Sequence, residues 1–96
     1  HFYDKGTFVP LISQFRGISV YMYTEPNTPH HLPHFHTYYG EYSATFTLMP
    51  PETLEGALPR TQLRLVLAWA EVHQAAIEEN WRLIQAGQPP RRIPGI

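Results

Sequence analysis

Two histidines, His34 and His36, have the type and spacing that could support chemistry in this sequence. The segment 34–39 has the composition of a β-strand, and side chains two residues apart on a strand lie on the same face. Neutral imidazoles on one face can share a metal ion, and His30 or His31 in the preceding loop would be a third ligand, with His31 the preferred candidate. Because three histidines and a water form a common open zinc site, the spacing favours zinc if these residues bind a metal. The alternative is a strand whose outer face carries His, Tyr and Thr because they suit a half-exposed sheet.

A binding surface rich in aromatic side chains is the second candidate. The alternation in 18–23 places Tyr21 and Tyr23 on one side of a predicted strand, and Tyr38 shares the face of the two histidines. Exposed aromatic rings on an open sheet can stack on unpaired bases or pack against a protein partner. The side chains expected on this face include no Lys or Arg. Since electrostatic attraction provides most nucleic-acid affinity, nucleic acid is not the favoured ligand.

Two arginines one helical turn apart, Arg60 and Arg64, complete the predicted binding surface. They fall near the start of a predicted helix, where a like charge and the positive end of the helix dipole both disfavour them. The cost is only about 0.3–1 kcal/mol, so the arrangement is compatible with chance. The functional interpretation is contact with an anion or with an acidic partner.

A β-hairpin is expected to position the histidines. The strands 34–39 and 42–48 flank Gly40-Glu41, a two-residue turn with glycine first, which suits a type II′ hairpin. This register places Phe35 opposite Phe46 on the core face and His36 opposite Thr45 on the outer face. The strand 18–23 and a short strand near 54–57 are expected to extend the sheet.

A helical segment follows from about Pro59 to Ala86, and Gly87 with Pro89-Pro90 ends it. Its apolar residues cover about half of the helix circumference, whereas a stripe of ~100° is usual. An unbroken helix would be roughly 40 Å long at about 1.5 Å per residue. We therefore expect either a break near His73 that gives two packed helices, or one long helix that buries part of its face on another chain.

The predicted fold class is α+β, with a small antiparallel sheet built on a β-hairpin and one long or two short C-terminal helices. Two polar residues, His73 and Asn80, fall in the apolar half of the helical segment. We expect such groups to be buried and satisfied by backbone hydrogen bonds. Because the apolar half is too wide for a small sheet to cover, we expect a homodimer or a small protein partner. The expected interface draws on Val66, Trp69, Ile77 and Trp81, divided between it and the core.

Length and composition limit the remaining possibilities. The 96 residues carry 7 Lys plus Arg and 8 Asp plus Glu, a formal charge of −1, which does not suit a strongly basic nucleic-acid binder. There is no cysteine, so disulfides and thiolate sites are excluded. We expect one domain over 11–88, an N-terminal arm over 1–10 and a Pro-rich basic tail over 89–96. No apolar run approaches the length of a membrane span, and we expect a cytoplasmic location without a leader.

Several motifs together resemble a bacterial family of small proteins that is known as domain-of-unknown-function family 4160 (DUF4160). They are Pro33-His34-Phe35-His36 with Tyr39-Gly40, Leu54-Glu55-Gly56, Trp69-Ala70-Glu71 and Glu79-Asn80-Trp81. The resemblance implies a compact α+β domain and a suspected role as a regulator or as a component of a toxin–antitoxin module, with no established reaction. We therefore expect a binding or regulatory component. The alternative is a zinc-dependent enzyme, such as a hydrolase or nuclease, that uses His34 and His36.

Overall fold

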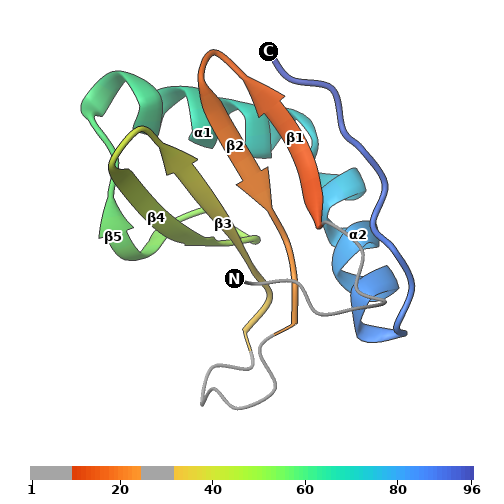
Figure 1. The fold of residues 1–96 in the computed structure, drawn as a ribbon. Coiled ribbons are helices and arrows are strands. Elements are labelled where there is room, and N and C mark those ends of the chain that lie inside the picture. Colours follow the sequence, from red (N-terminus) through yellow and green to blue (C-terminus); the bar gives the residue numbers. More distant parts are fainter. Residues whose placement is uncertain (1–9, 25–31) are drawn as a thin grey trace.

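Four successive antiparallel pairings build the sheet of this protein, whose computed structural model describes residues 10–24 and 32–96. The strands lie side by side in chain order, and two helices follow them (Figure 1). The elements are β1 (Leu11–Phe15), β2 (Ile18–Tyr21), β3 (His34–Tyr39), β4 (Tyr42–Thr47), β5 (Thr53–Ala57), α1 (Arg60–Val72) and α2 (Gln74–Gln85). The α+β class predicted from the sequence is confirmed.

The central hairpin of β3 and β4 has the predicted register. Phe35 pairs with Phe46, and His36 pairs with Thr45. The turn glycine, Gly40, has a φ of 57°, in the left-handed region that the first position of a type II′ turn requires. Strand β2 pairs with β3 so that Tyr21 lies opposite His36. The alternation along the sequence therefore separates a core face from an outer face, as expected.

The first hairpin, between β1 and β2, is not predicted by the sequence analysis. Phe15 pairs with Ile18, and the two turn residues Arg16 and Gly17 have φ values of 50° and 80°. Positive φ at both central positions defines a type I′ turn, which matches the right-handed twist of the strands. Asn-Gly or Asp-Gly is the usual sequence of this turn, so Arg-Gly is a weak signal for it.

Two helices, not one, cover the core face of the sheet (Figure 1). The helical conformation is interrupted at His73, which has φ −108° and ψ 28°, so the expectation of a break is confirmed and the continuous helix is wrong. The longest dimension of the molecule is 35 Å, less than the roughly 40 Å that an unbroken helix would need. The break lets Trp69 of α1 and Ile77 of α2 both reach the core, where each is at most 2% exposed.

The last residues of the chain pack along β1 and α2 (Figure 1). The Ile93 backbone N–H donates to the Ile12 carbonyl at 2.7 Å, and the Ser13 hydroxyl donates to the Ile93 carbonyl at 2.8 Å. A bulge between Leu11 and Ser13 interrupts the β1–β2 register at the same place. The tail thereby occupies the Ile12 carbonyl of an edge strand, a group that would otherwise be open to pairing with another chain.

Asn80 fixes the start of this tail. It is 1% exposed, its amide donates to the Arg91 carbonyl at 2.8 Å, and its carbonyl oxygen accepts from the Arg91 N–H at 2.8 Å. For Asn80 the expectation of a buried polar group satisfied by the backbone is confirmed. His73, the other polar residue, lies at the helix break, with its ring centroid 6.0 Å from that of Trp69.

Gly56 in β5 should not tolerate a side chain. Its φ is 76°, and an added Cβ would contact the Ser43 carbonyl oxygen and lie 3.0 Å from the Ala44 Cα. Gly87, with a φ of 77° and no atom within 4 Å of such a Cβ, is the matched control. We expect Gly87→Ala to cost about 1–2 kcal/mol of unfolding free energy from backbone strain, and Gly56→Ala to cost about 1–3 kcal/mol more from the clash. Urea denaturation measures both, and equal losses would contradict the predicted clash.

The two hydrogen bonds of Asn80 should stabilise the domain through the tail. Asn80→Ala leaves the Arg91 N–H and carbonyl without these partners, so we expect a loss of about 1–3 kcal/mol in unfolding free energy. Arg91→Ala removes an exposed side chain but keeps both backbone groups, and we expect a change within about 0.5 kcal/mol. Thermal denaturation and hydrogen exchange of the Ile93 amide report both effects. Unchanged exchange in Asn80→Ala would show that the tail is held by other contacts.

Candidate functional site

Five aromatic or imidazole side chains gather on the outer face of β2, β3 and the residues just after β2. This outer-face cluster consists of Tyr21, Tyr23, His34, His36 and Tyr38. The rings of Tyr23 and His36 are stacked, with centroids 4.3 Å apart and planes at 3°. The rings of Tyr21 and Tyr38 meet edge to face at 5.5 Å. The three tyrosines and two histidines predicted from the sequence to share a face are therefore in contact.

The sheet separates the cluster from α1 but not from α2. Trp69 of α1 packs on Phe35, on the core face of β3, so α1 lies on the side opposite to the cluster. Trp81 of α2 reaches the edge of the cluster at His34, with ring centroids 5.4 Å apart. The two histidines are nevertheless nearly buried, His34 at 4% and His36 at 9% exposed, whereas the three tyrosines are half-buried. The Tyr23 and Tyr38 hydroxyls lie 3.4 Å apart. The cluster therefore offers ring edges and hydroxyl groups over a buried imidazole pair.

The imidazoles are held by short contacts that restrict their chemistry. His34 Nδ1 lies 2.7 Å from the Leu32 carbonyl oxygen, which can only accept, so Nδ1 carries a proton. In the neutral ring the lone pair then lies on Nε2, and a carbonyl behind Nδ1 is also how metal-binding histidines are commonly oriented. His36 Nδ1 lies 3.3 Å from the Thr45 hydroxyl. The two ring centroids are 5.2 Å apart.

The structure brings together two of the three predicted metal ligands. His31 lies outside the described residues, so only the positions of His34 and His36 are described. Within residues 10–24 and 32–96, no group of three or more His, Cys, Asp or Glu side chains is arranged to hold a metal ion. Zinc binding therefore remains a prediction that depends on His31.

A shallow polar groove adjoins the cluster on the outer face. It has a volume of about 180 Å³, and its lining includes His36, Tyr38, Ser43, Thr45 and Glu55. Its polar side chains are hydroxyl groups, the His36 imidazole and the Glu55 carboxylate. The groove extends the outer-face cluster towards β5 and gives it a neutral to acidic border.

The two predicted arginines lie elsewhere. Arg60 and Arg64 are exposed on α1, which packs against the opposite face of the sheet. A ligand on the outer-face cluster would therefore not contact them directly. The sequence predicted one surface of tyrosines and arginines, but the tertiary structure separates them.

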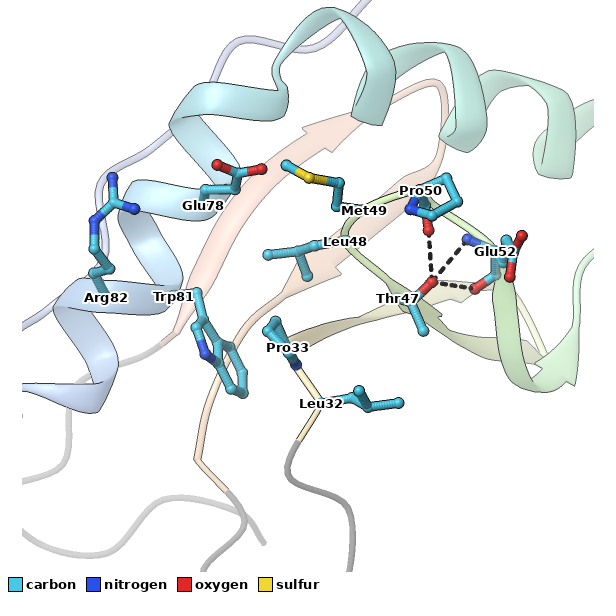
Figure 2. Close-up of a pocket in the computed structure, with 10 residues that line it drawn as sticks. All are labelled: Leu32, Pro33, Thr47, Leu48, Met49, Pro50, Glu52, Glu78, Trp81 and Arg82. Carbon is cyan, nitrogen blue, oxygen red and sulfur yellow. Dashed lines mark hydrogen bonds between the residues drawn. The ribbon is translucent and has the colours of Figure 1, made fainter.

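A larger groove, which the sequence analysis did not predict, lies where α2 passes the end of the β3–β4 hairpin (Figure 2). We call it the α2 groove; its volume is about 470 Å³. It is lined by Leu32, Pro33, Thr47, Leu48, Met49, Pro50, Glu52, Glu78, Trp81 and Arg82. The only sequence signal was a pair of apolar residues, Leu32 and Met49, next to prolines in loops.

The residues expected to form a dimer interface are mostly used within one chain. Val66, Trp69 and Ile77 are at most 2% exposed in the core. Trp81 is half-buried, lines the α2 groove and contacts His34 with ring centroids 5.4 Å apart. Of these four, Trp81 therefore retains the surface that a partner could contact, while the homodimer remains a prediction.

The comparison with protein families agrees with the resemblance noted in the sequence. The chain belongs to the family described as Domain of unknown function (DUF4160), whose model matches residues 17–82. The matched range contains β2 to β5, α1 and most of α2, and therefore both the outer-face cluster and the α2 groove. No curated protein and no solved structure matches the chain. Neither α1 nor α2, the helices of the described part of the chain, has the length and apolar character needed to cross a membrane.

Proposed function

We propose that this chain is a small regulatory protein that acts by binding another protein through its outer-face cluster. The observation that carries the proposal is the contact of three tyrosines with two histidines on the sheet face opposite to α1. The outer face of a two-layer α+β domain is normally polar and solvated. A cluster of aromatic rings there is typical of a contact surface.

The chemistry of the cluster favours a protein over a nucleic acid. Tyrosine rings offer a large, rigid contact area with a hydroxyl at the edge, which makes them frequent in protein interfaces. The cluster contains no Lys or Arg, and the adjoining groove carries Glu55. Within the described part of the chain, a phosphate backbone would therefore meet no Lys or Arg of the cluster, although phosphate contacts supply most nucleic-acid affinity.

The family resemblance is consistent with a binding role. Members of this family are suspected components of toxin–antitoxin modules, in which one small protein acts by binding another. A cytoplasmic regulator of this kind needs a contact surface and no catalytic constellation. We therefore place the partner of this chain among small proteins that dock on a tyrosine-rich surface.

Site-specific photo-crosslinking tests this function. We expect Tyr38→p-benzoylphenylalanine to form a covalent adduct with one protein when the variant is expressed in its own cell and irradiated. The matched control is the same replacement at Ala68, which is exposed on α1 behind the sheet. When Tyr21→Ser is combined with the replacement at position 38, the yield of the covalent adduct should fall. Equal adducts from positions 38 and 68, or an adduct that nuclease digests, would contradict a protein partner at this face.

The second candidate function is that of a metal-dependent enzyme, such as a hydrolase or nuclease. It is favoured by the orientation of His34, whose Nδ1 proton is directed to the Leu32 carbonyl, and by the proximity of the His36 ring. In this interpretation His34 and His36, with His31 as third ligand, would hold zinc. The metal would lower the pKa of a bound water and so provide a nucleophile.

Zinc titration of the purified chain without an affinity tag distinguishes this alternative. We expect about one Zn²⁺ per chain if the site forms, because the neutral imidazoles act together as ligands. His34→Ala combined with His36→Ala should abolish binding, whereas His73→Ala, on the helix break, should leave it unchanged. Equal zinc content of all three proteins by elemental analysis would reject the metal site.

A further inference from the structure

The α2 groove has a rigid frame on both sides. On the sheet side, the Thr47 hydroxyl donates to the Pro50 carbonyl at 2.7 Å and accepts from the Glu52 N–H at 3.1 Å. On the helix side, the Gln74 amide donates to the Leu48 carbonyl at 2.8 Å and to the Glu78 carboxylate at 3.1 Å. These bonds tie α2 to the loop after β4, so the groove is present before any ligand binds.

Apolar side chains form the floor and remain exposed there. Figure 2 shows the Trp81 ring beside Pro33, with Leu48 between Trp81 and the loop after β4. Among the described residues, five large hydrophobic side chains are exposed, and two of them, Leu32 at 55% and Met49 at 66%, line this groove. An exposed apolar patch that includes a tryptophan is typical of a protein interaction site.

The charged side chains at the rim of the α2 groove determine which kind of ligand it favours. Glu52 and Glu78 are both among the lining residues, and the Glu78 side chain extends towards Met49 (Figure 2). Among the described residues of the lining, Arg82 is the one Lys or Arg, and its guanidinium is already bound to Glu79 at 2.7 Å. The rim is therefore net negative, and charge complementarity favours a cationic group beside an apolar one.

We propose that the α2 groove binds a peptide segment of a partner protein in which an apolar side chain stands within two residues of a lysine or arginine. The apolar side chain packs on Trp81 and Met49, and the basic side chain pairs with Glu78. The groove volume of about 470 Å³ falls within the usual range for a small ligand or a few side chains. This site does not require that the outer-face cluster also binds a partner.

Selection of phage-displayed random peptides on the full chain tests the proposal. We expect the enriched peptides to share a large apolar residue within two positions of Lys or Arg. Fluorescence polarisation with the best peptide then measures affinity for two pairs of matched variants. Met49→Ser and Val72→Ser each remove an exposed apolar side chain, at 66% and 70% exposure, but only Met49 lines the groove. Glu78→Lys and Glu71→Lys each reverse a helix charge, but only Glu78 lines the groove.

The expected result is about a tenfold or greater loss of affinity in Met49→Ser and Glu78→Lys and less than about a twofold change in the two controls. Circular dichroism of each variant confirms that the fold is retained. Selected peptides without a basic residue, or equal affinities across the four variants, would overturn the proposal. Self-association of the wild type that Met49→Ser abolishes would overturn it too, because the occupant would then be a second copy of this chain.

Discussion

The indole of Trp69 is the contact on which the other parts of the structure depend. Its ring meets Phe35 of the sheet at 5.7 Å and Phe15 of the edge strand at 5.6 Å, and it is fully buried. Its Nε1–H donates to the Pro94 carbonyl at 2.9 Å. One side chain therefore joins α1, the sheet and the C-terminal tail. Buried tryptophans of this kind typically contribute about 3–5 kcal/mol to stability, which is a large share of the total for a small domain.

The break at His73 follows from the same packing. Trp69 anchors α1 on the sheet, and a straight continuation would carry the helix beyond a sheet that is shorter than the helix. The change of direction brings Ile77 into the core and leaves α2 beside the end of the β3–β4 hairpin. That position creates the α2 groove and brings Trp81 against His34. The break at His73, which allows Ile77 to be buried, therefore also forms the α2 groove.

Two surfaces with different chemistry result, and they adjoin through the contact of His34 with Trp81. The outer-face cluster presents tyrosine rings and hydroxyls around a buried imidazole pair, and none of its five residues is Lys or Arg. The α2 groove presents exposed aliphatic groups with carboxylates at its rim. Both lie within the range shared with the DUF4160 family, whereas β1 and the tail lie outside it. Ile93 of the tail bonds to the Ile12 carbonyl and to the Ser13 hydroxyl of β1, so the tail covers part of this edge strand.

Local patterns in the sequence determined the hairpin register, the turn at Gly40, the two faces of the sheet and the gathering of Tyr21, Tyr23 and Tyr38 with the histidines. These features follow from a period of two residues along a strand, which places every side chain once the register is known. The sequence also determined that the helical segment carried too much apolar surface for a small sheet. Only the tertiary structure decided that a break at His73 would bury it, that Arg60 and Arg64 would lie behind the sheet, and that Asn80 would hold the tail. Those outcomes depend on contacts between segments far apart in the chain, such as Trp69 with Pro94. No local periodicity encodes the position of one segment against another.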